Sequence, residues 1–93
     1  MKEYLSDTAA KLAEIDDEVW DAHGFRSRPS GEERRGYLED AVALIRKKVN
    51  ESKITEDVVL ELENENRHSL LDAIDVALGR TSVEDLMEKE MEV

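Results

Sequence analysis

A row of four carboxylates occupies one face of a helix predicted near the N-terminus. The row has the spacing i, i+3, i+4 and i+7 and consists of Glu14, Asp17, Glu18 and Asp21. Residues at these intervals lie on the same side of an α-helix, where like charges repel one another. The row lies toward the C-terminal end of the helix, where the dipole also disfavours anions, and we expect no cation to offset it. Stability alone does not explain the row, so it is a candidate surface for a basic partner.

The spacing of these charges is close to that of a nucleic-acid backbone. Seven residues of helix span about 10.5 Å, so four charges are separated by nearly the phosphate spacing of one DNA strand, about 3.4 Å. Asp57, Glu61 and Glu65 would form a second row on a later helix. The partner could therefore be a protein that normally binds DNA or RNA. The simpler alternative is that both rows only keep the protein soluble.

Two further acidic patterns could bind metal ions. Glu65 and His68 match Glu-x-x-His, which supplies two ligands from one helix in di-iron four-helix proteins. That site needs a second copy of the motif, and Trp20 stands where a glutamate would have to precede His23 by three residues. We therefore expect no metal site and no cofactor.

A magnesium-dependent reaction is the other metal hypothesis. Asp72 and Asp75 lie in an otherwise apolar segment. With acids of the first helix they could hold Mg²⁺, as the acidic helices of all-α nucleotide pyrophosphatases do. The acids of the first helix lie outside its predicted buried seam, however, and Arg80 is well placed to pair with Asp75. A metal-dependent nucleotide hydrolase is thus the third functional alternative.

The composition favours a binding protein over an enzyme. Acids outnumber bases by 24 to 13 in 93 residues, for a net charge of −11, which disfavours direct contact with nucleic acid or an anionic membrane and favours basic partners. The absence of cysteine excludes disulfides, thiol catalysis and thiolate metal sites. No Gly-rich phosphate loop, nucleophile elbow or Ser/His/Asp pattern is present. We therefore expect no catalytic residues.

The length and the N-terminal segment predict one small protein domain outside the membrane. Residues 1–93 are enough for a single acidic helical domain. The segment Met1-Lys2-Glu3-Tyr4 has no apolar signal region, and no apolar run approaches the length of a membrane span. We expect a soluble, cytoplasmic protein.

The first helix should run from about Glu3 to His23. Its apolar seam follows a 3-4-3-4-3 spacing and consists of Leu5, Thr8, Leu12, Ile15, Val19 and Ala22. This is the seam of a bundle or coiled coil, and with only four aromatic residues in the chain it predicts a homodimer. Gly24 suits the left-handed position after the helix, which would place Trp20 and Phe25 in contact in a Schellman cap.

Three or four further helices should follow. Ser30 and Glu33 form a capping box for a helix that reaches about Asn50, and Thr81 and Glu84 form another before a short C-terminal helix. Residues 54–62 fit both a strand and a helix, and Thr55 as a helix cap favours the helix. Residues 70–78, closed by Gly79, form the most apolar segment and should be the central helix, with Asp72 and Asp75 on its exposed side.

These patterns predict an all-α fold, a compact bundle of about four helices plus a short C-terminal helix. The expected function is that of a small non-catalytic adaptor, regulator or inhibitor that binds another protein through a carboxylate-rich helical face. The alternative is a nucleic-acid mimic of the anti-restriction or anti-CRISPR type. The candidate partner-binding residues are Glu14, Asp17, Glu18, Asp21, Asp57, Glu61 and Glu65.

Overall fold

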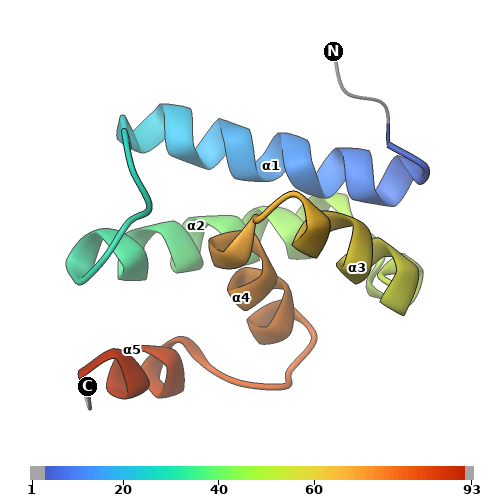
Figure 1. Ribbon diagram of the computed structural model, residues 1–93. Helices are drawn as coiled ribbons and strands as arrows, with labels where there is room; N and C mark the ends of the chain where they lie inside the picture. Colours follow the sequence, from blue (N-terminus) through green and yellow to red (C-terminus); the bar gives the residue numbers. More distant parts are fainter. Residues whose placement is uncertain (1–3, 92–93) are drawn as a thin grey trace.

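The computed structural model describes residues 4–91 and shows five α-helices and no strand in that range (Figure 1). The elements are α1 (Asp7–His23), α2 (Glu32–Lys48), a short 3₁₀ helix η1 (Glu51–Lys53), α3 (Glu56–Asn64), α4 (His68–Ala77) and α5 (Val83–Met91). The Cα radius of gyration is 12.6 Å, close to the roughly 13 Å of a compact domain of 100 residues. The predicted all-α bundle is confirmed.

Helices α2 and α4 share the most extensive helix–helix contact in the molecule. Helix α1 lies beside α2 and runs in the opposite direction, whereas α4 crosses α2 on another side (Figure 1). Helix α5 packs against the start of α2, where Arg34 and Arg35 contact it. Helix α4 also contacts α1 and α3. The predicted central helix is therefore central, but it shares that position with α2.

The core is built from aliphatic side chains on the facing sides of these helices. Leu70 and Ile74 of α4 pack with Leu38 and Ile45 of α2, and all four are buried. From the predicted seam of α1, Leu12, Ile15 and Val19 are buried in the same cluster. The middle of the seam is therefore covered within one chain, whereas Ala22 at its end is exposed.

The start of α1 differs from the prediction. The helix begins at Asp7 because the Ser6 hydroxyl accepts hydrogen bonds from the N–H groups of Thr8 and Ala9. Leu5 precedes this cap and is 99% exposed, so it does not belong to the seam. Glu3, the predicted start, lies outside the described residues.

Three helices end in the same Schellman motif, with a left-handed residue after the helix. At α1, Gly24 has φ of 71° and the Phe25 N–H donates to the Trp20 carbonyl at 3.1 Å. The Trp20 and Phe25 rings meet edge to face with centroids 6.0 Å apart, so the predicted cap is confirmed. Helix α4 ends in the same way, since Gly79 has φ of 78° and the Arg80 N–H donates to the carbonyl of Asp75 at 2.9 Å.

The third motif of this kind directs the chain from α3 into α4. Asn66 adopts φ of 59°, and it is the one residue other than glycine with positive φ among those described. Its N–H donates to Glu63 O at 2.9 Å, and the Arg67 N–H donates to Leu62 O at 3.3 Å. Asparagine tolerates this conformation better than other residues with a Cβ atom. The left-handed turn thus sets the direction in which Arg67 leaves the helix.

Two of the predicted helix starts are wrong by one residue. Gly31 rather than Ser30 occupies the N-cap of α2, so the predicted capping box does not form, and the helix ends at Lys48 before Asn50. At α5 the Ser82 hydroxyl, rather than that of Thr81, accepts from the Asp85 N–H at 3.1 Å.

Residues 56–64 settle the helix-or-strand ambiguity in favour of the helix. Thr55 caps α3 by accepting from the Val58 N–H at 3.4 Å. The 9-residue helix buries Val58 and Leu62. Val58, Leu60 and Leu62 alternate as in a strand, but in the helix Leu60 lies on the outer side and is 52% exposed.

The two aspartates of α4 pair with arginines. Asp75 lies 3.5 Å from Arg80 just past the helix end, as predicted. Asp72 was expected to be exposed, but it lies 2.9 Å from Arg34 with only 26% of its side chain exposed. The reason is that the first turn of α2 packs beside α4 and α5, where Arg34 also donates to the Leu86 carbonyl at 3.1 Å. Within residues 4–91, no helix combines the length and apolar character needed to cross a bilayer.

The left-handed turn at Asn66 can be tested by substitution. Asn66→Ala should lower the free energy of unfolding by about 1–2 kcal/mol, the cost of a left-handed conformation for a residue with a Cβ atom. Asn66→Gly should be nearly neutral because glycine adopts this φ without strain. Urea denaturation measures both, with Asn64→Ala in the last turn of α3 as the control. Equal losses for Asn66→Ala and Asn66→Gly would contradict the backbone explanation.

Candidate functional site

The four carboxylates predicted on α1 do share one exposed face of that helix, which we call the α1 acidic face (Glu14, Asp17, Glu18 and Asp21). The expectation that no cation offsets them is wrong. Lys48 Nζ lies 3.5 Å from Glu18, and Arg67 Nη1 lies 3.0 Å from Asp17. Both cations come from other elements, the end of α2 and the turn before α4, so spacing along α1 could not reveal them.

The remaining two charges of the α1 acidic face have no ion-pair partner in the part of the chain that the structure describes. Glu14 and Asp21 are exposed, and Asp21 lies in the last turn of α1. That turn carries the negative end of the helix dipole, so a carboxylate there is disfavoured. These two residues are the part of the face most available to an external cation.

The second predicted acidic row does not exist as one exposed surface. Asp57 is exposed, but Glu61 accepts a hydrogen bond from the Leu5 N–H at 2.9 Å. Glu65 falls in the cap after α3, where its side chain is only 8% exposed and faces Arg67. The row is broken because α3 ends at Asn64, one residue before Glu65.

A buried polar cluster centred on Arg67 lies directly behind the α1 acidic face, and its existence was not predicted. Asp16 is 6% exposed. The Tyr37 hydroxyl donates to Asp16 Oδ1 at 2.6 Å, and Arg67 Nη1 donates to Asp16 Oδ2 at 2.7 Å. Both carboxylate oxygens are therefore satisfied, which is what a buried charge requires.

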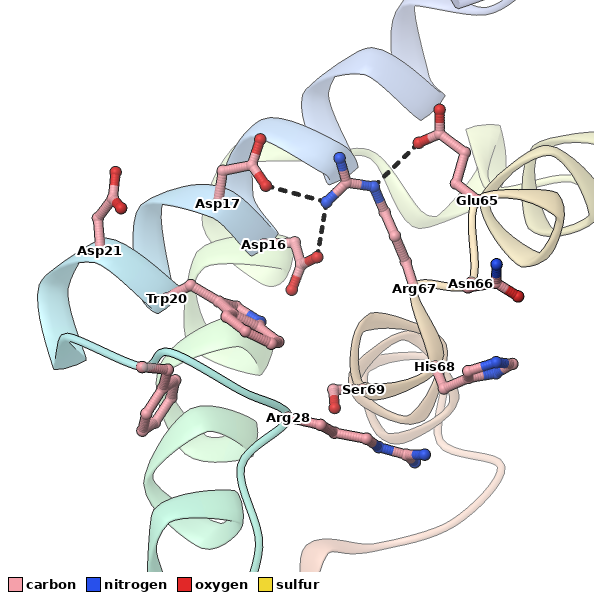
Figure 2. A pocket seen from close by; sticks show the side chains of 11 residues that line it. Asp16, Asp17, Trp20, Asp21, Arg28, Glu65, Asn66, Arg67, His68 and Ser69 are labelled. Carbon is pink, nitrogen blue, oxygen red and sulfur yellow. Dashed lines mark hydrogen bonds and ion pairs between the residues drawn. The ribbon is translucent and has the colours of Figure 1, made fainter.

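The other side of the same guanidinium holds the N-terminal segment. Arg67 Nε donates to Glu65 Oε1 at 3.0 Å and Nη2 donates to the Tyr4 hydroxyl at 3.3 Å, while Tyr4 donates to Glu65. We call this set the Arg67 network; it comprises Tyr4, Asp16, Asp17, Tyr37, Glu65 and Arg67. Figure 2 shows Arg67 reaching from the turn before α4 to the acids of α1 on one side and to Glu65 on the other.

Arg67 and Tyr37 keep their protons over the ordinary pH range. Burial lowers the pKa of Arg67, but its hydrogen bonds to Glu65, Asp17, Asp16 and Tyr4 raise that pKa by more, so the net shift is upward. Burial raises the pKa of Tyr37, and the Asp16 charge raises it further. Neither group releases a proton near neutral pH. These two groups are therefore suited to holding elements in place, whereas acid–base chemistry needs a pKa near the working pH.

A groove with a volume of about 600 Å³ opens beside this network, between α1, the loop after α1 and the start of α4. We call it the α1–α4 groove. Figure 2 shows Trp20 and Asp21 on the α1 side, Ser69 and His68 at the start of α4, and Arg28 crossing below them. Asp16, Asp17, Glu65 and Arg67 also line it. The groove thus joins an aromatic wall to a carboxylate-rich rim.

The structure does not favour the two metal hypotheses. Glu65 faces Arg67, whereas His68 is exposed at the start of α4. Asp72 and Asp75 each pair with an arginine. Among the described residues, no three His, Asp or Glu side chains are grouped so that they could hold a metal ion.

Comparisons with known proteins identify no relative. No protein-family model matches the chain, and no curated protein or solved structure matches it significantly.

Sequence signals for the Arg67 network do exist. Asp16 lies between Leu12 and Val19 on the apolar side of α1, so it is a charge where the helix pattern predicts burial. Arg67 is the only lysine or arginine between Ile54 and Gly79. A buried acid needs a cationic partner. Because Arg67 is the one base in that part of the sequence, it is the natural candidate to pair with Asp16.

The Arg67 network gives a prediction for stability. Arg67→Met should lower the free energy of unfolding by about 3–5 kcal/mol, because it leaves the buried Asp16 carboxylate without its cation. Asp16→Asn in the same chain should recover much of that loss, since the uncompensated charge is then removed. Chemical denaturation of the single and double variants measures this coupling.

The matched control for this prediction is Arg80→Met, which breaks an ion pair with Asp75 that is largely exposed. An exposed pair contributes only about 0–1 kcal/mol. If Arg67→Met and Arg80→Met lowered stability equally, the central role of the network would be contradicted.

Proposed function

We propose that this protein is a small non-catalytic adaptor, regulator or inhibitor that binds a basic surface of another protein through the α1 acidic face. The observation that supports the proposal best is the position of Glu14 and Asp21, which are exposed on one helix face and have no ion-pair partner in the described part of the chain.

The electrostatics of the face supports this proposal. Asp17 and Glu18 keep 68% and 53% of their side chains exposed while they pair with Arg67 and Lys48, so they can also contact a partner. With a net charge of −11, the molecule attracts basic proteins over a distance of about one Debye length, roughly 8–10 Å at physiological salt. Complementary charge of this kind raises the association rate and selects the partner.

The nucleic-acid mimic is a narrower form of the same proposal. The regular spacing of the four carboxylates favours it, but Lys48 and Arg67 partly neutralise the middle of the row. The face therefore presents less charge than a phosphate backbone of equal length. The two forms differ in the partner's own ligand, so competition by DNA or RNA for the isolated partner separates them.

A nucleotide hydrolase has less support, because Asp72 and Asp75 are engaged by Arg34 and Arg80. A cytoplasmic location and a homodimer stay predictions that nothing described above tests.

The proposal is tested with a double variant that spares the internal ion pairs. Glu14→Gln with Asp21→Asn removes the two unpaired charges and leaves Asp17 and Glu18 bonded. Association with the partner isolated by affinity capture should slow by roughly tenfold at low salt, the lower end of electrostatic steering effects. Its dependence on salt should flatten while the circular dichroism spectrum is unchanged. Stopped-flow kinetics at two salt concentrations measures this.

The control removes the same total charge elsewhere. Glu63→Gln with Glu88→Gln changes two exposed acids on α3 and α5, and it should leave the association rate close to that of the wild type. Equal rates for the α1 variant and this control would reject the assignment of the site to α1.

A further inference from the structure

Two residues that line the α1–α4 groove, Trp20 and Ser69, each carry a buried polar atom that no described residue satisfies. Trp20 Nε1 and Ser69 Oγ are buried without a hydrogen-bond partner, and they are the buried side-chain atoms of this kind found within residues 4–91. Both residues line the groove, and Ser69 is only 5% exposed. Figure 2 shows the Ser69 side chain directed from α4 toward the Trp20 side of the groove. Buried polar groups in native proteins are nearly always paired, so these two indicate a ligand atom that accepts hydrogen bonds.

The charges around the groove restrict what that ligand can be. Four carboxylates and two arginines line it, so its formal charge is negative. Asp21 has no ion-pair partner in the described part of the chain, whereas Arg67 is shared among three acids. An anion such as phosphate would supply the acceptor but would meet this negative rim. A neutral carbonyl oxygen next to a cation satisfies both the donors and the acids.

The aromatic wall favours arginine as that cation. Trp20 is held by its edge-to-face contact with Phe25 at the end of α1, so the indole is fixed before any ligand binds. A guanidinium stacks on an indole face and can also donate two hydrogen bonds to a carboxylate. The ammonium group of lysine lacks the planar fork for the second contact.

We infer that the α1–α4 groove binds an arginine side chain of the basic partner together with a neighbouring peptide carbonyl. The guanidinium lies against Trp20 and bonds Asp21, and the carbonyl oxygen, which has two lone pairs, accepts from Trp20 Nε1 and Ser69 Oγ. The groove volume of about 600 Å³ lies within the range of small-ligand sites, about 300–1,000 Å³. This inference rests on the proposed function, because its ligand is a segment of a basic protein.

The probe for this test is the blocked tripeptide acetyl-Gly-Arg-Gly-amide, followed by ¹⁵N–¹H NMR. Because Trp20 is the only tryptophan, its indole N–H gives one signal that reports on the groove directly. The arginine peptide should shift this signal saturably, together with the Ser69 amide. The matching lysine peptide should bind roughly threefold to tenfold more weakly, since it loses the stacked guanidinium.

Two variants separate binding from folding. Ser69→Ala removes a buried hydroxyl that has no partner, so stability should hold or rise, whereas binding of the peptide should weaken by roughly fivefold. Asp21→Asn should weaken binding by a similar factor, and Glu63→Gln, which removes the same charge from an exposed position of α3, should not weaken it. If Ser69 served only the fold, Ser69→Ala would lower stability and leave peptide binding unaltered.

Three outcomes would overturn the inference. The first is the absence of a saturable shift of the Trp20 signal with the arginine peptide. The second is equal shifts with acetyl-Gly-Gly-Gly-amide or inorganic phosphate, which would indicate a site for a carbonyl or an anion without the arginine. The third is wild-type affinity in both Ser69→Ala and Asp21→Asn.

Failure of the groove and failure of the proposed function give different results. If the tripeptide binds as expected but the Glu14→Gln/Asp21→Asn protein associates with its partner at the wild-type rate, the proposed function fails and the groove remains a site for arginine. If partner association depends on the α1 acidic face while the tripeptide leaves Trp20 unshifted, the inference about the groove alone is rejected.

Discussion

The contact between the Arg67 guanidinium and the buried Asp16 carboxylate determines how the two halves of this molecule meet. Asp16 belongs to α1 and Arg67 to the turn between α3 and α4, and they meet at 2.7 Å. Each charge is costly to bury alone, so α1 and the turn before α4 are stable only when packed with the two side chains in contact. The same contact places Asp17 within reach of Arg67 and sets the start of α4 beside Trp20. The shape of the groove thus depends on this ion pair.

Local sequence patterns predicted most of the fold because the determinants of each helix lie within it. The apolar periodicity of α1 and α4, the Gly24 cap with Trp20 and Phe25, and Thr55 at the start of α3 were all readable in this way. One error occurs where two neighbouring residues can each cap a helix, as Thr81 and Ser82 can, since the choice depends on how the finished helix packs.

The candidate site was less predictable because its parts come from different elements. Helical spacing correctly grouped Glu14 and Asp21, but it could not show that Lys48 and Arg67 approach the same face. The predicted row that included Glu65 failed for a related reason, since a helix end turned that side chain inward. The groove joins Trp20, Arg28 and Ser69 from three segments. Only the tertiary structure brings such residues together.

The hydrogen bonds of Tyr4 and Leu5 to α3 and its cap have a consequence for the order of folding. Tyr4 and Glu65 are 61 residues apart in the chain. Closing a loop of that length costs roughly 3.6 kcal/mol of chain entropy, and each of the three hydrogen bonds that hold Tyr4 and Leu5 contributes about 0.5–1.5 kcal/mol. Together these bonds do little more than offset the cost of closure, so we do not expect Tyr4 and Leu5 to nucleate the bundle. Tyr4 and Leu5 should close onto α3 and its cap after α1 and α3 have docked, and we expect their amide hydrogens to exchange through a small local opening.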